Sequence, residues 1–308
     1  MKDVSFIIVS WNARKYLVEC LSSIRDDARA IDHEVIVVDN ASTDGSQEAV
    51  RALFPEARLI ELPSNSGFAA ANNTGIREST GRYVFLVNSD IRIIPGCVGR
   101  IIRYLDKNAG AGLVGPRVLN ADGTLQLSCR RAPSLGRNLL AALGFESIRK
   151  DLLYHPHDRT REVDVLSGCF LSARRAAVEE AGLLDERFFF YAEDKDWCRR
   201  IRSAGWKIVY LPEAEAIHYG GKSSANAPLQ YYIEMHRANL KYWAKHHGGL
   251  KYAYLAIAAL HQAVRVARGE ALSSLKKGRH EENRHKVERS LRCLRWIFTE
   301  GLREARNI

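Results

Sequence analysis

The sequence predicts an α/β fold in which a mostly parallel sheet carries helices on both faces. Over the first half of the chain, short apolar runs alternate with segments of helical period. Polar clusters follow several of these runs, as is typical of the ligand-binding edge of such a sheet. With 308 residues, 46% hydrophobic and 27% charged, the chain can form one large domain with an appended segment.

Four apolar runs predict the parallel strands, and the segments between them predict the helices. The strands are expected at residues 4–10, 34–39, 58–62 and 82–87. The first helix is expected at 12–25, the second runs from near Ser46 to Phe54 before Pro55, and the third covers 68–79. This order places three polar clusters, at residues 10–12, 39–40 and 88–90, along one edge of the sheet.

The second half of the chain has a looser pattern. Strands are expected at 113–119, 124–128, 163–171 and 207–211, a short helix at 174–181, and an irregular basic loop at 130–160. Beyond residue 228 the chain reads as helical and basic. We therefore predict a catalytic domain at 1–228, with a nucleotide-binding half to about 115 and an acceptor half from about 116, followed by a helical extension at 229–308.

The formal net charge of +10 indicates a polyanionic partner, which could be a nucleotide, an acidic membrane surface or nucleic acid. No motif of interleaved aromatic and basic residues is present, which disfavours nucleic acid. The six cysteines are scattered without a C-x-x-C pair, so buried reduced thiols are expected. No signal peptide and no apolar run of spanning length is found, so a cytoplasmic location is predicted.

The segment FFFYAEDKDWCRR places Glu193, Asp194 and Asp196 behind four aromatic residues. Carboxylates so close together repel one another and resist burial, so such a cluster indicates a functional role in binding or catalysis. Asp194 is the candidate general base, because nearby aromatic rings can raise the pKa of a carboxyl group. The alternative is an acidic first turn that the helix dipole favours.

The polar clusters at the predicted sheet edge suit a nucleotide. Asp39 can accept a hydrogen bond from a base or a ribose hydroxyl, and the alternative is a turn that only ends the strand. Neither a P-loop nor a G-x-G-x-x-G motif is present, so the diphosphate charge needs another partner. Asp90 and His218 could share a divalent metal, with Lys222 beside a glycine-rich stretch.

Seven segments in order resemble the family 2 inverting glycosyltransferases of the A-type fold, and in particular the bacterial rhamnosyltransferase-like branch. They are VSFIIVSWN, VVDNASTDGS, NSGFAAANNTGI, FLVNSD, GCF, FFYAEDKDWCRRIRSAGW and HYGGKS. The resemblance covers roughly residues 3–247. It implies an A-type glycosyltransferase fold with a Rossmann-like, mostly parallel sheet and a C-terminal helical extension.

The resemblance implies a role for each matching residue. Asp194 would be the catalytic base, with Glu193 positioning it or the acceptor. Asp90 and His218 would bind Mg²⁺ or Mn²⁺, although Asn88 stands where the family often has the first aspartate of its metal motif, which weakens that site. The residues expected to contact the nucleotide sugar, two of which also belong to the metal motif, are Ser10, Asn12, Asp39, Asn65, Gly67, Asn72, Asn88, Asp90 and Lys222. Asp196 and Arg200 would be structural.

The implied activity is transfer of a sugar, rhamnose from dTDP-rhamnose, onto a hydroxyl of a glycan or lipid-linked glycan in surface polysaccharide synthesis such as that of O-antigen. A UDP-sugar donor is the first alternative, because a fold does not encode the sugar. A non-catalytic module that binds a sugar nucleotide is the second. A homo-oligomer stays open.

The C-terminal segment carries two apolar groups among basic residues, at 251–268 and 291–303. Helices of this composition can lie on an anionic membrane surface, which would make the protein peripheral on the inner face of the cytoplasmic membrane. The alternative is packing on the catalytic domain or on a partner subunit. The sequence favours neither.

Overall fold

A computed structural model describes residues 2–145, 149–220, 228–275 and 280–308. The chain forms two compact units. The sheet unit comprises Met1–Ala132 and Tyr154–Asn226, and the helical unit comprises Pro133–Leu153 and Ala227–Ile308. Residues 133–153, which the sequence prediction places in the acceptor half, thus group with the C-terminal helices.

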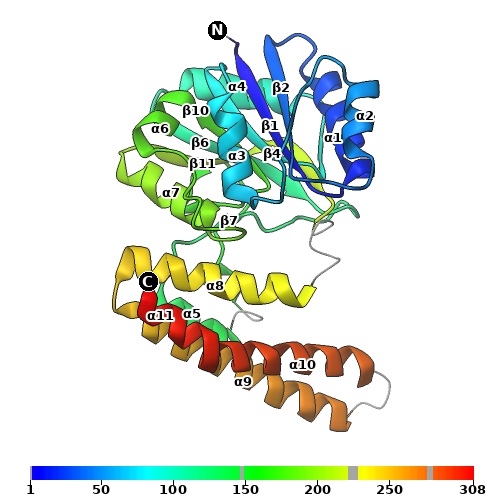
Figure 1. Ribbon diagram of the computed structural model, residues 1–308. Coiled ribbons are helices and arrows are strands. Elements are labelled where there is room, and N and C mark those ends of the chain that lie inside the picture. Colours follow the sequence, from blue (N-terminus) through cyan, green and yellow to red (C-terminus); the bar gives the residue numbers. More distant parts are fainter. Residues whose placement is uncertain (1, 146–148, 221–227, 276–279) are drawn as a thin grey trace. The chain divides into compact units, whose positions relative to one another are not determined.

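The sheet unit is built on a mixed, mostly parallel sheet, as the sequence predicts (Figure 1). Within the described residues this sheet has nine strands, in the order β3-β2-β1-β4-β10-β6-β11-β5, with β8 beside β11. Their bounds are β1 Val4–Ser10, β2 His33–Asp39, β3 Arg58–Glu61, β4 Tyr83–Asn88, β5 Ile91–Ile93, β6 Ala111–Leu119, β8 Arg161–Glu162, β10 Phe170–Arg174 and β11 Lys207–His218. β1 to β4 run parallel, whereas β10 and β5 run antiparallel to their neighbours. A separate pair joins β7 Cys129–Arg130 to β9 Val165–Leu166.

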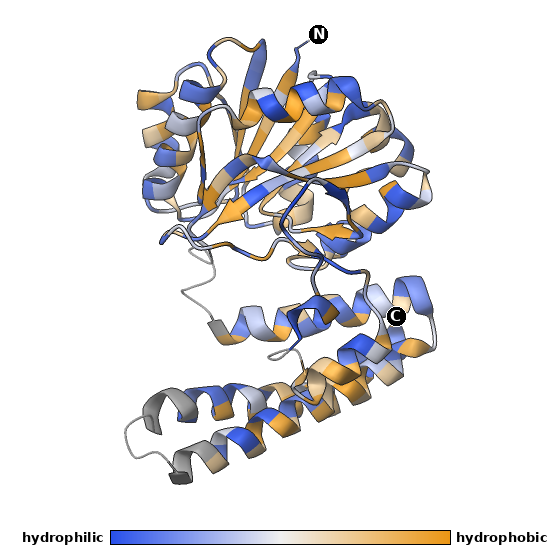
Figure 2. Ribbon diagram, turned by 180° about the vertical axis from the view of Figure 1, so that it is seen from behind, coloured by the Kyte–Doolittle hydropathy of each residue, from blue (hydrophilic) through white to orange (hydrophobic). Residues whose placement is uncertain are grey.

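Helices cover both faces of the sheet because its strands are apolar on both sides. Phe6 and Ile8 of β1 pack in one core with α1 Arg14–Asp27, α2 Ser46–Leu53 and α4 Cys97–Lys107. Ile7 faces the other core with α3 Phe68–Arg77, α6 Arg175–Ala181 and α7 Glu193–Ser203. The strands of the sheet accordingly appear as apolar ribbons in Figure 2. All six cysteines are free and buried, as predicted.

Three predicted elements differ from the structure. No strand forms at 124–128, where Leu125 makes only an isolated bridge to Leu119. The strand expected at 163–171 is divided into β9 and β10, which belong to different sheets. The strand expected at 207–211 continues to His218 through a register shift between Leu211 and Glu215.

The segment 130–160 was expected to be irregular, and this prediction is wrong over two stretches. Residues Leu135–Ala142 form α5, and Lys150–Leu152 form the short 3₁₀ helix η2. Basic residues and two prolines suggested a loop, but Ala141 and Ala142 are buried within the helical unit. Tertiary packing therefore decides the structure of this segment.

The helical unit otherwise consists of helices from the C-terminal part of the chain. They are α8 Pro228–His247, α9 Leu250–Leu275, α10 His280–Trp296, the π-helical turn η3 Ile297–Gly301 and α11 Leu302–Asn307. Their core includes Leu240, Trp243, Leu255, Cys293 and Trp296. Arg237 of α8 joins the C-terminal end of the chain through Glu304, with Nε donating to Oε1 over 2.9 Å. None of the described helices combines the length and hydropathy needed to cross a membrane.

Candidate active site

The strand register brings three predicted site residues to one edge of the sheet. Ser10 pairs with Asp39 across β1 and β2, and Val9 pairs with Asn88 across β1 and β4. All three polar residues therefore lie at the carboxyl ends of adjacent parallel strands. This is the edge at which open α/β sheets bind their ligands.

Buried polar atoms at this edge lack partners. Among the described residues, Ser10 Oγ, Asp39 Oδ1 and Asn88 Oδ1 are enclosed without a hydrogen bond. Buried polar atoms in proteins are almost always paired, because an unpaired one costs about 1–3 kcal/mol. Three of them at the same edge of the sheet indicate that a polar ligand completes the site.

Asp39 uses one carboxylate oxygen in the turn after β2, and its other oxygen has no partner among the described residues. Its Oδ2 accepts from the Ser42 backbone N–H over 2.9 Å and from Gln47 Nε2 over 2.8 Å. These bonds hold the turn that ends β2, which was the alternative reading of Asp39. Its Oδ1 stays available for a base or ribose donor.

Asn12 joins the first two strand ends and has an unusual backbone. Its Oδ1 accepts from the Thr43 N–H over 2.8 Å, and its own N–H donates to Ser42 Oγ over 2.9 Å. Asn12 has φ 50° and Ala41 has φ 63°, both in the left-handed region that non-glycine residues rarely adopt. Such strain gathers at functional sites, where the surrounding structure enforces it. Asn12 therefore ties the end of β1 to residues 42–43 through its side chain and its backbone N–H.

Asn65 and Gly67 lie in a loop that is tied to two neighbouring segments. Asn40 Nδ2 donates to Asn65 Oδ1 over 2.9 Å, and Asn40 Oδ1 accepts from the Ser66 N–H over 2.8 Å. The Phe68 N–H donates to the Phe189 carbonyl over 2.7 Å, which ties the start of α3 to the segment before α7. Asn40 is the residue that organises this loop, and sequence reasoning did not single it out.

Asn72 and its neighbour Asn73 are both buried on α3. Asn72 Nδ2 donates to the Phe68 carbonyl one turn earlier, so this amide group is used within its own helix. Asn73 was not predicted, yet its amide holds Leu184 by both backbone groups. The spacing of the two asparagines gave no signal to separate these roles.

Asp90 and His218 are brought together from positions far apart in the chain. β11 pairs with β5 so that His218 lies opposite Ile91, and His218 Nε2 lies 3.2 Å from Asp90 Oδ1. Both side chains are largely buried. The pairing that the sequence suggested is thus present in the fold, while Lys222 lies outside the described residues.

Gln126 determines which nitrogen of His218 carries the proton. Gln126 Nε2 donates to Asn120 Oδ1 over 2.9 Å, which orients the amide so that its Oε1 faces His218 Nδ1 at 2.7 Å. Since this oxygen can only accept, Nδ1 must carry a hydrogen. In a neutral ring the lone pair of Nε2 then points at the Asp90 carboxylate. Two acceptors in contact require a shared proton or a bound cation between them.

These residues fit part of a divalent metal shell. Among the described residues no group of three His, Cys, Asp or Glu side chains could hold a metal ion. Asp90 and His218 supply two ligands, and the unpaired Asn88 Oδ1 is a neutral oxygen on the adjacent strand end. Mg²⁺ and Mn²⁺ commonly take their other ligands from substrate phosphate and water. The donor set therefore suits a metal that arrives with a phosphate ligand.

Asp194 is joined to the same edge through the loop before β10. Its Oδ2 accepts from the Gly168 N–H over 3.2 Å, and the next residue, Cys169, accepts from the Asn88 N–H over 3.0 Å. Burial raises the pKa of Cys169 to about 12, with further contributions from both Asp90 and Asp194. Cys169 therefore lies near both carboxylates, so the Asp90–His218 pair and the candidate base Asp194 belong to one site.

Glu193 is the acid whose ionisation the fold opposes. It is 5% exposed, and its Oε2 has no hydrogen-bond partner among the described residues. Burial, followed by the charge of Asp194, raises the pKa of Glu193 to about 8. Burial also lowers the pKa of Lys195 to about 8. The start of α7 therefore contains two groups that titrate near neutral pH beside Asp194.

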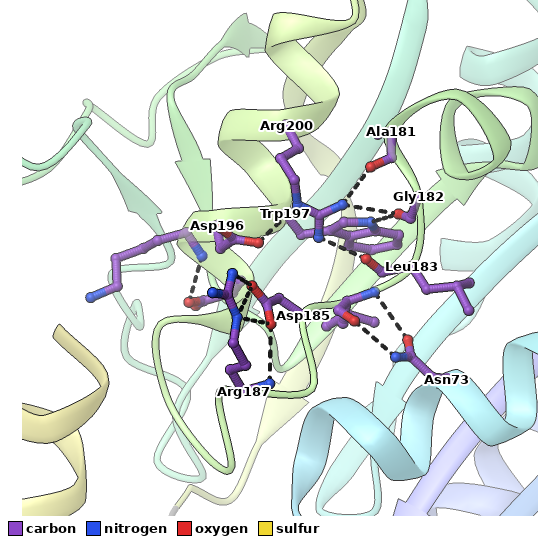
Figure 3. A network of polar contacts seen from close by, with 12 residues as sticks. Asn73, Ala181, Gly182, Leu183, Asp185, Arg187, Asp196, Trp197 and Arg200 are labelled. Atoms are coloured by element: carbon purple, nitrogen blue, oxygen red, sulfur yellow. Dashed lines mark hydrogen bonds and ion pairs between the residues drawn. The ribbon is translucent and has the colours of Figure 1, made fainter. Parts of the chain in front are cut away.

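The backbone before α7 is strained and firmly anchored. Tyr191 and Ala192 have φ of 70° and 67°, so two consecutive non-glycine residues are left-handed. The other side of α7 is fixed by Asp196, whose Oδ2 accepts from Arg200 Nε over 2.8 Å. Arg200 and Trp197 in turn donate to the Gly182 carbonyl, as Figure 3 shows. Asp196 and Arg200 are thus structural, as expected, and they hold the helix that carries Asp194.

Comparison with known proteins identifies the family. The sequence model described as glycosyl transferase family 2 matches residues 5–182 of this chain. That match covers more than half of the sequence.

The chain belongs to glycosyl transferase family 2.

Curated relatives agree with this assignment. The chain is 32% identical over 235 residues to the N-acetylglucosaminyl-diphospho-decaprenol L-rhamnosyltransferase of Mycobacterium tuberculosis, covering 70% of this chain and 76% of the relative. It is 25% identical over 222 residues to the low-salt glycan biosynthesis hexosyltransferase Agl10 of Haloferax volcanii, covering 71% and 67% of the two chains. The protein is therefore a glycosyltransferase of family 2.

Solved structures confirm the A-type glycosyltransferase fold. The mannosyltransferase PcManGT of Pyrobaculum calidifontis, in complex with GDP-Man and Mn²⁺, aligns with a TM-score of 0.59 at 19% identity, covering 96% of this chain and 87% of that one. GalNAc-T7, with UDP, GalNAc and Mn²⁺, aligns with a TM-score of 0.60 at 16% identity, covering 97% and 56%. At these identities the likeness extends to the fold alone.

Proposed function

We propose that this family 2 glycosyltransferase moves a rhamnosyl residue from dTDP-rhamnose onto a hydroxyl of a lipid-linked glycan, with inversion at the anomeric carbon. The observation that carries the donor and acceptor classes is the 32% identity, over 70% of this chain, with the mycobacterial rhamnosyltransferase. Its name describes a diphospho-decaprenol acceptor carrying N-acetylglucosamine. We extend that chemistry to the present chain as a surface-polysaccharide transferase.

In the proposed reaction Asp194 is the general base. The acceptor hydroxyl gives its proton to Asp194, and the acceptor oxygen forms a bond to the anomeric carbon. The bond from that carbon to the diphosphate oxygen breaks, and the electron pair leaves with the nucleoside diphosphate. The Gly168 N–H holds Asp194 Oδ2 in place, and the anchored α7 fixes its backbone.

The nucleotide is bound at the strand edge in this proposal. Asp39 Oδ1, which is buried and unpaired, accepts from the base or ribose, and the Ser10 hydroxyl, also buried and unpaired, donates to or accepts from them. Asp90 and His218 would hold Mg²⁺ or Mn²⁺ together with the diphosphate. A bound metal of this kind stabilises negative charge on the leaving group. Asn65, Gly67 and Asn72 border the donor through the loop and helix that contain them.

The test is direct transfer measured with the purified protein. We expect dTDP-rhamnose, but not UDP-glucose, to label a short-chain diphospholipid bearing N-acetylglucosamine in the presence of Mg²⁺ or Mn²⁺. A thermal-shift series with dTDP, UDP and GDP, each with metal or EDTA, checks the donor separately, because ligands raise the midpoint by mass action. A metal-dependent shift selective for UDP would replace the rhamnosyl donor with a UDP-hexose. No shift with any nucleotide would contradict the donor site.

The first mutational prediction concerns the base. Asp194→Asn removes the proton acceptor while keeping the shape of the side chain, so transfer should fall by about 10³-fold or more and the dTDP thermal shift should persist. Asp158→Asn is the matched control, because Asp158 is a surface carboxylate whose side chain is 67% exposed. Loss of the dTDP shift together with activity would assign Asp194 to donor binding instead.

A further inference from the structure

The helical unit carries the whole excess of positive charge. Its two segments contain 19 lysines and arginines against 9 aspartates and glutamates, whereas the sheet unit contains 27 of each kind. The net charge of +10 is therefore not needed to bind the nucleotide, which the sheet unit holds. It points to a polyanionic partner of the helical unit.

The exposed face of α5 is apolar. Ala141 and Ala142 are buried, whereas Leu139, Leu140 and Leu143 are 39%, 38% and 44% exposed, and Phe145 just beyond the helix is 47% exposed. A helix on the surface of a soluble protein normally turns polar residues to solvent. Here Leu139 and Leu140 lie four and three residues before Leu143, the residue that follows α5, so the three exposed leucines share one side; Gly136 is the other exposed position of the helix.

The exposed face of α9 continues this character. From residue 252 to residue 267, every exposed position of α9 is uncharged. These positions are Tyr252, Ala256, Leu260, Ala263 and Ala267. Their spacing of three and four residues places them on one side of the helix. Figure 2 shows the apolar residues along this helix.

α5 and α9 are packed together, and basic residues flank the apolar face. Arg268 of α9 donates from one terminal nitrogen to the carbonyl of Leu143 over 3.1 Å and so closes the end of α5. Lys150 and Arg268 are exposed, and Arg149, which is also exposed, forms an ion pair with Asp151 over 2.9 Å. The surface thus combines exposed leucines with a basic margin.

We propose that α5 and α9 form a docking surface for the face of an anionic lipid bilayer. An apolar stripe with basic residues beside it matches the boundary between acidic headgroups and acyl chains. A second copy of this chain is disfavoured as the occupant, because each copy would bring the same excess of positive charge. This inference goes beyond the proposed transfer reaction, although it would place the catalytic domain where lipid-linked acceptors are found.

The test measures vesicle binding of the full chain without donor or acceptor, so its result does not depend on the proposed function. Flotation is compared for vesicles of phosphatidylcholine alone and with about 30% phosphatidylglycerol added, a content that gives a strongly negative surface. The chain should float with the anionic vesicles and bind the neutral ones at least about tenfold more weakly. Leu139→Glu/Leu143→Glu should lower binding to anionic vesicles by about tenfold or more.

A matched control has the same chemistry at other exposed leucines. Leu53→Glu/Leu291→Glu changes the net charge equally, and these residues are 51% and 49% exposed on α2 and α10. It should bind anionic vesicles nearly as well as the unmodified chain. Because all four leucines are exposed, both variants should keep the thermal midpoint of the parent. Leu140→Glu provides a single-site variant if the double variant unfolds.

Two outcomes would overturn the proposal. One is equal flotation of the parent and of Leu139→Glu/Leu143→Glu. The other is a stable dimer in solution that these substitutions convert to monomer while the parent fails to float, which would assign the face to a second copy. Transfer to a water-soluble acceptor serves as an independent measure, and its failure would count against the proposed function alone.

Discussion

Several side chains of the candidate site have buried oxygen atoms without a hydrogen-bond partner among the described residues. Asp39 Oδ2 accepts hydrogen bonds within the turn after β2, whereas its Oδ1 has no partner in the part of the chain that the structure describes. Glu193 is buried, and its Oε2 is also without a partner among the described residues. Buried polar atoms are almost always paired, so these oxygens are positions where a polar ligand could supply the partner.

Glu193 should make stability depend on pH. Its pKa in the folded chain, about 8, lies above its ordinary value of 4.5, so folding favours the protonated acid. This contribution is complete below about pH 4.5 and is lost as the pH rises toward 8. Glu193→Gln should therefore gain thermal midpoint relative to the parent between about pH 5 and pH 8, on the order of 2–4 °C for each kcal/mol recovered.

The measurement is a series of thermal unfolding curves in buffers of constant ionic strength. Glu179→Gln, on α6, is a control in which no such trend is expected. A difference between Glu193→Gln and parent that stays constant over this range would show that Glu193 is ionised in the folded chain.

Gln126 should affect metal binding by Asp90 and His218, because it contacts the His218 ring. Gln126→Leu removes the acceptor that fixes Nδ1–H, so His218 can present the wrong nitrogen to Asp90. The metal-dependent part of the dTDP thermal shift should shrink, corresponding to a loss of about 10–100-fold in metal affinity. The shift in EDTA should stay unchanged. Gln230→Leu, at an exposed position of α8, is the matched control.

At the scale of elements, the start of α3 and the segment before α7 depend on each other. Gly67 has φ 85°, and a Cβ placed there would lie 2.4 Å from the carbonyl oxygen of Phe189. Glycine therefore permits both the left-handed turn and the close contact that joins the loop before α3 to the segment containing the strained residues Tyr191 and Ala192.

Gly67→Ala should separate these two segments. We expect a loss of about 2–4 kcal/mol in the free energy of unfolding, because the new methyl group meets backbone rather than a flexible side chain. Denaturation in urea measures this loss. Gly110→Ala is the control, since a Cβ at Gly110 meets nothing within 4 Å and should change stability by about 0.5 kcal/mol or less. Equal stabilities of the two variants would contradict the close contact.

The elements near the N-terminus were more predictable than those in the middle of the chain. The strands from 4 to 88 were predictable because each is a short apolar run followed by a helix-period segment, so local pattern and fold agree. α5 was missed because leucines occupy its exposed side, so the segment lacks the amphipathic pattern of a surface helix. Its partner α9 begins only at Leu250. A pattern read from one segment cannot report a partner that far away.

The candidate site was predictable to a similar extent. Asp39, Asn88 and Asp90 follow apolar runs, so strand order alone brings them to one edge. Gln126 was missed, and Asn40 was placed in the predicted 39–40 cluster without a role of its own, because polar residues in turns are common and only the fold shows which of them reach a site residue. The finer roles assigned to the site residues stay predictions.

At the scale of the whole molecule, the excess positive charge and the candidate active site belong to different units. The sheet unit is electrically balanced and contains the candidate site, while the helical unit is basic. Long-range attraction to an anionic surface should therefore act on the helical unit. This attraction is screened within a Debye length, which is about 10 Å at 0.1 M salt and about 3 Å at 1 M.

Binding to anionic vesicles should accordingly depend on salt. Raising the NaCl concentration from about 0.1 M to about 1 M should release most of the bound chain, by at least about tenfold in partition. Sedimentation of vesicles at several salt concentrations measures the effect. Binding that persisted at the higher salt would mean that the apolar face of α5 and α9 acts without the basic residues.

The discontinuous make-up of the helical unit also has a consequence for synthesis on the ribosome. α5 leaves the ribosome early, but α9, with which it is in contact, is translated only after the rest of the sheet unit. At about 5–20 residues per second, the nascent segment waits on the order of 5–20 seconds with both of its faces uncovered. During that interval its leucines are available to chaperones or to a nearby bilayer. The order of translation thus gives the membrane an opportunity to meet α5 before the protein is complete.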